Sequence, residues 1–142
     1  MQLNIHISND KSTFEKAMQI RQTVFVDEQN FVDEFDEIDK IAYHAAVFDN
    51  DKLIGCGRVF LDEKGCHIGR IAVVKEYRGK KVGSYIVTEL EKFGAKTFEF
   101  DKYVLSAQTR VKDFYSCLGY KEHGDIYFEE HCEHVEMYKQ KQ

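Results

Sequence analysis

Apolar and polar residues alternate over several short stretches of the chain, and this period-two pattern predicts β-strands. In the first stretch, residues 2–8, Leu3, Ile5 and Ile7 share one face. The stretch 103–108, YVLSAQ, is apolar at most positions, as in a strand buried at the centre of a sheet. Strands are expected over residues 2–8, 42–49, 53–61, 66–74, 103–108, 125–130 and 135–140.

Between these strands, apolar positions recur with a period near 3.6 residues, which predicts helices. They are expected over residues 9–29, 84–96 and 110–120. Asp10 or Ser12 is suited to cap the first helix. The stretch 30–40 is acidic and resembles a loop.

This order of elements predicts an α/β (α+β) fold. Its first half is expected to be mostly antiparallel, and residues 73–108 read as a β-α-β unit. We expect residues 1–142 to form one domain, because that length is usual for a domain and the sequence shows no repeat or linker.

Composition and charge narrow the possible functions. The formal net charge of -5 argues against bulk attraction to nucleic acid. No apolar run is long enough to span a membrane, and the N-terminus does not resemble a signal peptide. The four cysteines are scattered, so we expect reduced thiols and a cytoplasmic protein.

A basic loop with two glycines, residues 78–84 (RGKKVGS), stands between a predicted strand and a predicted helix. The first N–H groups of a helix lack partners and carry the positive end of its dipole. Gly79 and Gly83 would let an anion approach these groups, so the loop is suited to bind phosphate. A solvated basic turn is the alternative, since neither G-x-x-x-x-G-K-S/T nor G-x-G-x-x-G is matched. The basic residues of the loop are Arg78, Lys80 and Lys81.

The segment RIAVVKEYRGKKVGS resembles the signature of the GNAT superfamily, the acetyl-CoA-dependent N-acetyltransferases. That signature is an apolar strand with an L-x-V-like pair, followed by a Q/R-x-x-G-x-G/A loop and a helix. Ile71 and Val73 match the pair, and Arg78 and Gly83 match the first and last loop positions. Lys81 replaces the middle glycine, so we expect a non-glycine backbone conformation there.

A second stretch, FYSCLGY at 114–120, resembles the short helix of this family whose tyrosine lies near the thioester sulfur. The segment RQTVFVDEQ and His44 look like those of a small, uncharacterised bacterial subgroup. The resemblance covers essentially the whole chain. It implies a GNAT-like fold: a mixed, mostly antiparallel sheet of about six to seven strands, about four helices, and two strands that splay apart at the cofactor site.

The resemblance also implies acetyl-CoA as co-substrate, with its pantetheine arm between the strand ending at Val73 and the strand 103–108. Its amides would pair with strand backbone as a peptide does, and its pyrophosphate would lie on residues 78–84. Gln108 is suited to bind pantetheine or a local backbone group. The implied cofactor-binding residues are Ile71, Ala72, Val73, Arg78, Gly79, Lys80, Lys81, Val82, Gly83, Ser84, Gln108, Phe114 and Tyr115.

For the chemistry, the resemblance implies that a primary amine of a small molecule or peptide attacks the thioester directly in a ternary complex. A backbone N–H near Val73 would stabilise the oxyanion. Tyr115 would protonate the departing thiolate, or else it is a core aromatic. Glu28, His44 and His134 are all candidates for the base that deprotonates the amine, and the sequence does not rank them.

Two motifs suggest metal binding only superficially. The run HCEH, residues 131–134, has three ligand-type side chains, but a structural zinc site needs four in an established spacing. The run DEFDEID, residues 33–39, lacks the glycine and terminal glutamate of an EF-hand loop. We therefore expect no metal.

The stretch 27–39 is the most acidic part of the chain. In the resembled fold it lines the acceptor side, where carboxylates would attract a cationic acceptor; a solvated loop is the alternative. The predicted function is an acetyl-CoA-dependent N-acetyltransferase, with a non-catalytic CoA-binding or sensor protein, or an interaction module, as alternatives. We expect no nucleic-acid or membrane partner, and edge strands would allow a homodimer.

Overall fold

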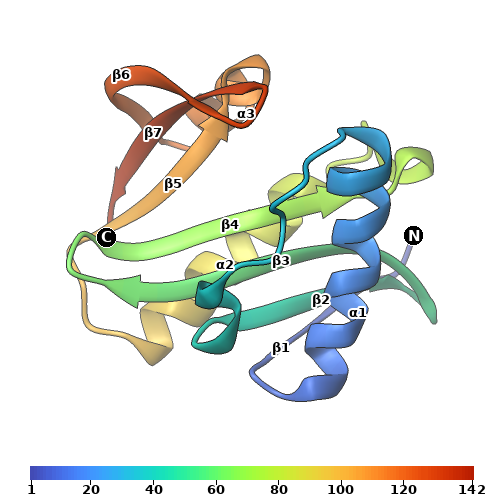
Figure 1. Cartoon of the computed structure of the whole chain (residues 1–142). Coiled ribbons are helices and arrows are strands. Elements are labelled where there is room, and N and C mark those ends of the chain that lie inside the picture. Colours follow the sequence, from blue (N-terminus) through green and yellow to red (C-terminus); the bar gives the residue numbers. More distant parts are fainter.

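The computed structural model describes all 142 residues, and its centre is one seven-stranded sheet (Figure 1). The strand order is β1-β2-β3-β4-β5-β7-β6, and every neighbouring pair is antiparallel except β4 and β5. The predicted mixed, mostly antiparallel sheet is therefore confirmed. The strands are β1 (Leu3–Ser8), β2 (Tyr43–Asp49), β3 (Lys52–Asp62), β4 (Gly65–Val73), β5 (Lys102–Gln108), β6 (Lys121–Glu129) and β7 (Cys132–Gln140).

Three α-helices and several tighter or wider turns complete the chain. The α-helices are α1 (Lys11–Arg21), α2 (Val82–Thr97) and α3 (Lys112–Cys117). Asp10 caps α1, since its side chain accepts a hydrogen bond from the Thr13 N–H at 2.8 Å. The helix expected over residues 9–29 is α-helical only to Arg21, and η1 (Gln22–Glu28) continues it as π-helical turns. Short 3-10 turns are η2 (Glu37–Lys40), η3 (Lys75–Tyr77) and η4 (Thr109–Val111).

Helix α2 packs on one face of the sheet and places its own N-terminus beside the end of β4 (Figure 1). Ile86 and Leu90 are fully buried there, which stabilises the fold by about 1.5–3 kcal/mol for each side chain. Glycines permit this close approach: a Cβ on Gly57 would lie 2.8 Å from the Leu90 side chain, and one on Gly94 2.7 Å from Cys66 Sγ.

Helix α1 and η1 cover the opposite face (Figure 1). Ala17, Ile20 and Val24 are buried against Cys56 of β3 and Ala72 of β4. Because both faces of β4 are covered, its C-terminal end is held between the α1 and α2 layers. No helix of the chain combines the length and the apolar character needed to cross a lipid bilayer.

The sheet splits between β4 and β5. These parallel strands pair only at Cys66 with Tyr103 and at His67 with Val104. Beyond that point β5, β6 and β7 turn away from β4 (Figure 1). On its other edge β4 has a bulge opposite Gly57, where Arg70 takes a left-handed conformation with φ 49°. The expected splayed strands are therefore present.

Candidate active site

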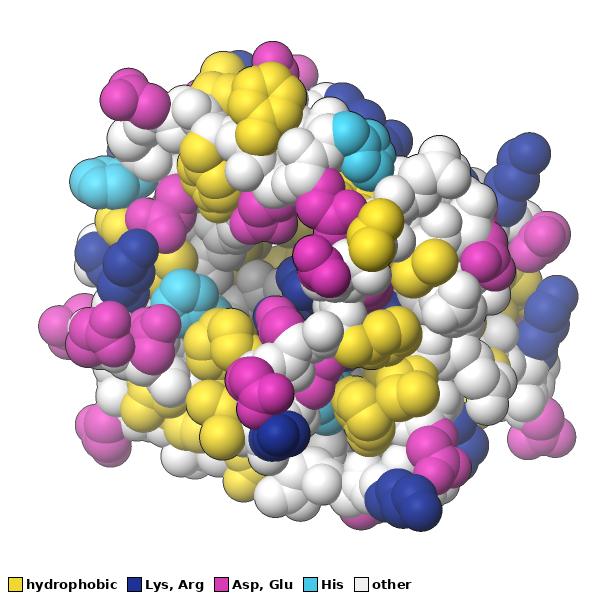
Figure 2. Space-filling view, in the orientation of Figure 1, with side chains coloured by type: hydrophobic (Ala, Val, Ile, Leu, Met, Phe, Trp, Pro, Cys, Tyr) yellow, Lys and Arg dark blue, Asp and Glu magenta, His cyan; other side chains and the backbone are white.

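A cavity of about 720 Å³ opens where β4 and β5 separate. We divide its lining into two sides. The loop side contains Ile71, Ala72, Val73, Arg78, Gln108 and Tyr115. The ionic side contains charged or polar residues of the segments 33–36, 58–70 and 129–134, together with Ser106. Figure 2 shows a hollow whose rim carries several Asp and Glu side chains.

On the loop side, the edge of β4 presents free backbone groups to the cavity. The Val74 N–H donates to the Ile54 carbonyl of β3 at 2.9 Å. Successive N–H groups of a strand point to opposite edges, so the Val73 N–H points into the gap between β4 and β5. The Val73 carbonyl lies on the same edge, where it accepts the Arg78 Nε–H at 3.0 Å.

The loop from Arg78 to Ser84 leads into the N-terminus of α2, as the sequence predicts. Gly79 has φ 76° and Lys81, the N-cap residue, has φ 66°. The expectation of a non-glycine conformation at Lys81 is therefore wrong: the lysine adopts the left-handed conformation that the missing glycine would take, at a cost of about 1 kcal/mol. Residue 83 is glycine beside Phe114, whose ring would lie 3.2 Å from an added Cβ.

Arg78 is already bound by the protein. Its guanidinium donates to both carboxylate oxygens of Glu28 at 2.8 and 3.0 Å, in addition to the Val73 carbonyl. Glu28 does not line the cavity. The structure therefore places Glu28, one of the three base candidates, as the partner of an arginine at the mouth of the loop side.

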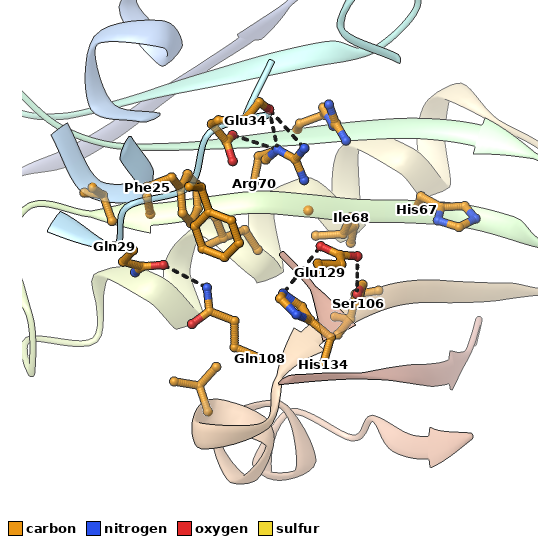
Figure 3. Close-up of a pocket in the computed structure, with 18 of the residues that line it drawn as sticks. Phe25, Gln29, Glu34, His67, Ile68, Arg70, Ser106, Gln108, Glu129 and His134 are labelled. Carbon is orange, nitrogen blue, oxygen red and sulfur yellow. Dashed lines mark hydrogen bonds and ion pairs between the residues drawn. The ribbon is translucent and has the colours of Figure 1, made fainter. Parts of the chain in front are cut away.

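Gln108 bridges the two halves of the split sheet. Its amide N–H donates to the Gln29 side-chain oxygen at 2.9 Å, and its own oxygen accepts from Arg110 Nε at 2.8 Å. Figure 3 shows the Gln29–Gln108 pair spanning the cavity below Phe25. These two bonds use one of the two amide N–H groups and one of the two oxygen lone pairs, so Gln108 can still bind a ligand.

Tyr115 lines the loop side with its hydroxyl free of hydrogen bonds to the protein. Its ring lies between Phe114 and Tyr120, with centroid distances of 4.9 and 6.1 Å. Burial raises the pKa of Tyr115 to about 12. The phenol is therefore protonated at neutral pH and has a proton to donate into the cavity.

His44 lies outside the cavity. It is 2% exposed and packs on Phe14, with ring centroids 4.8 Å apart. Its Nε2–H donates to the Asp39 carbonyl at 3.0 Å, which leaves Nδ1 buried without a partner. Burial lowers the pKa of His44. With no access to the cavity, His44 is in no position to act on a substrate there.

His134 is the base candidate that does line the cavity. It is 5% exposed, and its Nδ1 lies 3.0 Å from the Cys132 carbonyl. A carbonyl oxygen only accepts, so Nδ1 carries the proton and Nε2 is free to accept one. The nearest charged group to Nε2 is the Glu129 carboxylate at 3.5 Å, which also accepts from Ser106 Oγ at 3.2 Å (Figure 3). Ser106 in turn contacts the Tyr127 hydroxyl.

Three carboxylates of the acidic stretch are paired with arginines and do not form the free rim that the sequence suggested, whereas Asp33 lines the cavity without an ion pair. Glu34 binds Arg21 at 2.9 Å and Arg70 at 2.7 Å. Asp39 is clamped between Arg21 and Arg58 at 2.8 and 2.9 Å. Burial alone would raise the pKa of Asp39, but the two arginines outweigh it and lower the pKa to about 2. The arginine network consists of Arg21, Arg58, Arg70, Glu34, Asp36 and Asp39.

One hydrogen-bonded pair on the cavity wall was not anticipated. His67 Nε2 lies 2.9 Å from Asp62 Oδ1, and the His67 ring stacks on Phe60 at 4.7 Å. The pair joins the end of β3 to β4 across their turn. Strand alternation places His67 and Gly69 on one face, but nothing in the local pattern indicates that this face opens on a cavity.

The run HCEH does not converge on one point. The His131 ring packs on Phe31 at 4.9 Å, and Cys132 uses its carbonyl to hold His134. No group of three or more His, Cys, Asp or Glu side chains in the chain is arranged to hold a metal ion.

The sequence and the fold of this chain are similar to those of known proteins. Residues 10–141 match the family described as Acetyltransferase (GNAT) domain. The chain is 32% identical to the uncharacterized protein YyaT of Bacillus subtilis, over 97% of this chain and 96% of YyaT. The crystal structure of Escherichia coli ElaA matches with a TM-score of 0.87 at 24% identity, over 97% of this chain and 99% of that one.

A solved aminoglycoside 6′-N-acetyltransferase complexed with coenzyme A shares the fold, with a TM-score of 0.73 at 16% identity over 99% of this chain and 97% of that one. That enzyme was solved with coenzyme A bound on this fold. Since the family match spans nearly all of the sequence, the chain belongs to the GNAT acetyltransferase family.

Proposed function

We propose that the chain is an acetyl-CoA-dependent N-acetyltransferase that acetylates a primary amine of a small molecule or peptide by direct attack in a ternary complex. The observation that carries the proposal is one cavity lined by the open edge of β4, the unpartnered hydroxyl of Tyr115 and the free Nε2 of His134. An electrophile anchor, an acid and a base are the three elements that acyl transfer to an amine requires.

The loop side supplies the binding surface for the co-substrate. The open edge of β4 can pair with the pantetheine amides as a neighbouring strand would. The N-terminus of α2 offers unpaired N–H groups and the positive end of its dipole to the pyrophosphate. Lys80 and Lys81 add positive charge at that helix start, so binding combines backbone hydrogen bonds with charge.

The base in this proposal is His134. A protonated amine has no lone pair for attack, so its proton must leave first. Nε2 of His134 accepts that proton because Nδ1–H is held by the Cys132 carbonyl. The imidazolium formed is then stabilised by the Glu129 carboxylate, 3.5 Å from Nε2. The neutral amine attacks the thioester carbonyl carbon, and a new C–N bond forms.

The Val73 N–H, which points into the gap, donates to the carbonyl oxygen as negative charge develops there. Collapse of the adduct breaks the C–S bond, and the electron pair leaves on sulfur. Tyr115 donates its hydroxyl proton to this thiolate, so the products are the amide and coenzyme A thiol. Solvent then returns a proton to Tyr115 and removes the one on His134.

Steady-state kinetics test the proposal. Acetyl-CoA turnover is followed by release of free thiol while both acetyl-CoA and an amine are varied. Direct attack predicts intersecting double-reciprocal lines, whereas parallel lines would indicate an acetyl-enzyme and contradict the ternary complex. Calorimetry with coenzyme A is run in parallel: binding without turnover of any alkyl, amino-acid or lysine-peptide amine would favour the non-catalytic CoA-binding alternative.

A further inference from the structure

The arginine network contributes no net charge to the ionic side. Its three guanidinium groups and three carboxylates pair with one another at 2.7–3.2 Å. Arg21 and Arg58 are almost fully buried within it, and Arg70 is partly exposed. These arginines are therefore neutralised by Glu34, Asp36 and Asp39, and they are not available to bind an anionic acceptor.

Four further carboxylates line the same side without any lysine or arginine partner, namely Asp33, Asp62, Glu129 and Glu130. Asp62 pairs with His67, and Glu129 with His134 and Ser106. Glu130 accepts the N–H groups of Val32 and Asp33 at 2.8 and 2.9 Å. Arg110 also lines the cavity and binds the Gln108 side-chain oxygen, so four carboxylates face one arginine outside the ion pairs and leave a surplus of negative charge.

A second observation shows that this charge surrounds a ligand position. His134 is 5% exposed, lines the cavity, and its Nε2 makes no hydrogen bond within the protein. Figure 3 shows its ring below Glu129, with Ser106 beside it. An imidazole nitrogen that faces a cavity without a hydrogen bond to the protein is open to a donor group of a ligand, so a donor group of the acceptor is expected next to Glu129.

The nucleophilic nitrogen cannot balance the surplus charge throughout the reaction, because it gives up its proton before attack. A second ammonium or guanidinium group on the acceptor would keep its charge. Resting on the proposed function, we infer that the acceptor is an amine that carries a second positive charge, and that Glu129 and Asp62 hold this distal cation while His134 takes the proton of the nucleophile.

A matched series of acceptors tests this inference. 1,4-Diaminobutane, 1-aminobutane and 4-aminobutanoate have the same chain length and differ at the far end only, which is cationic, apolar or anionic. Calorimetry on the protein saturated with coenzyme A should show the diamine binding at least about tenfold more tightly than either analogue, as for a desolvated charge pair. Equal binding, absent binding, or a preference for the carboxylate would overturn the inference.

Variants locate the site. Asp62→Asn should weaken diamine binding by about tenfold and leave 1-aminobutane unchanged, because only the distal charge is lost. Glu129→Gln should weaken diamine binding by a similar factor, and it should also slow the turnover of 1-aminobutane, because Glu129 stabilises the His134 imidazolium. Glu63→Gln removes an exposed carboxylate next to Asp62 that lines no part of the cavity, and it serves as the control. Loss of diamine preference in the control, or its retention in both site variants, would contradict the assignment.

The same measurements separate this inference from the proposed function. If coenzyme A binds and 1-aminobutane or 4-aminobutanoate is acetylated as fast as the diamine, the acetyltransferase proposal stands and the dication inference fails. If coenzyme A does not bind at all, the acetyltransferase proposal fails, whatever the amines do.

Discussion

The loop side and the ionic side of the cavity are built from different kinds of atoms. Apart from the side chains of Gln108 and Tyr115, the loop side relies on backbone groups of one continuous segment, residues 71–84, which joins the end of β4 to the start of α2. The ionic side is made of side chains from the segment before η2, from β3, β4, β5, β6 and β7, and from the β6–β7 turn. Backbone groups suit the binding of a co-substrate that a whole family shares, whereas side chains can differ between family members that use different acceptors.

The largest effect on turnover is expected at Tyr115, the loop-side residue proposed to protonate the leaving thiolate. Tyr115→Phe keeps the ring and removes the proton donor, so kcat should fall by about 10²–10⁴-fold while coenzyme A affinity is retained. With the pKa of Tyr115 at about 12, the wild-type rate should show no loss from tyrosine ionisation below pH 10. Thiol-release kinetics from pH 6 to pH 10 measure both.

Tyr43→Phe is the matched control, because Tyr43 packs on Phe93 and lines no part of the cavity. It should leave kcat unchanged. Normal turnover in Tyr115→Phe would assign Tyr115 to packing and require water as the proton source.

The backbone character of the loop side is tested at Gly83. Gly83→Asp places a carboxylate at the helix start that should bind pyrophosphate, so coenzyme A affinity should fall by about 100-fold or more. Gly83→Ala brings only the Cβ contact with Phe114 at 3.2 Å, and its loss should be smaller. Calorimetry on both variants, with circular dichroism to verify folding, separates charge from crowding; equal losses would make the contact responsible.

The rigidity of the ionic side is tested at Asp39. Asp39→Asn leaves Arg21 and Arg58 short of a buried partner, so unfolding free energy should fall by about 3 kcal/mol. Asp33→Asn, an exposed residue with no ion pair, should change it by less than about 0.5 kcal/mol. Urea denaturation at pH 7 measures both, and similar small losses would show that the network is not a rigid wall.

The same carboxyl group makes a pH-dependent contribution. Its folded pKa is lowered to about 2, so its stabilisation is complete above the unfolded value near 4 and is lost as pH falls from about 4 through about 2. The shift corresponds to about 2–3 kcal/mol. Asp39→Asn should reduce the dependence of unfolding free energy on pH between about 4 and about 2. An unchanged dependence in that range would show that other groups cause it.

The contrast between the two sides also explains what could be predicted from sequence. Residues 71–84 form their site with backbone groups whose conformation depends on neighbouring residues. A short sequence motif such as Arg78 to Gly83 therefore predicts this conformation. Even there, the sequence did not predict the left-handed conformation of Lys81. A lysine at the motif's glycine position suggested a different backbone conformation, but the backbone keeps the glycine-like one. The strand pattern likewise predicted the sheet, since period-two alternation is a local property.

The ion pairs of the ionic side could not be predicted from local sequence patterns, because the residues that pair are distant in sequence. Glu34 and Arg70 meet across 36 positions, and the run 33–39 alone resembles any solvated acidic loop. Strand alternation puts His134 and Glu136 on one face, but it does not record the contact of His134 with Glu129, which Ser106 also binds. Burial of His44 depends on α1 packing against β2, which no residue near His44 records.

The smallest effect is expected at the ion pair between Arg78 of the loop side and Glu28. Arg78 and Glu28 are 42% and 33% exposed, and pairs of this kind contribute about 0–1 kcal/mol. If Arg78 serves the pyrophosphate, Glu28 competes with it and its charge repels the phosphates. Glu28→Gln should then strengthen coenzyme A binding by about two- to fivefold, with a smaller gain at high salt because exposed charges are screened.

The control is Glu76→Gln, which removes a charge on η3 that has no ion pair, and this variant should bind coenzyme A as the wild type does. Calorimetry at 0.05 M and 0.5 M salt, about 14 and 4 Å Debye length, checks the direction. Weaker binding in Glu28→Gln would mean that the carboxylate positions Arg78 for the phosphates, and the ion pair would then belong to the preformed loop side.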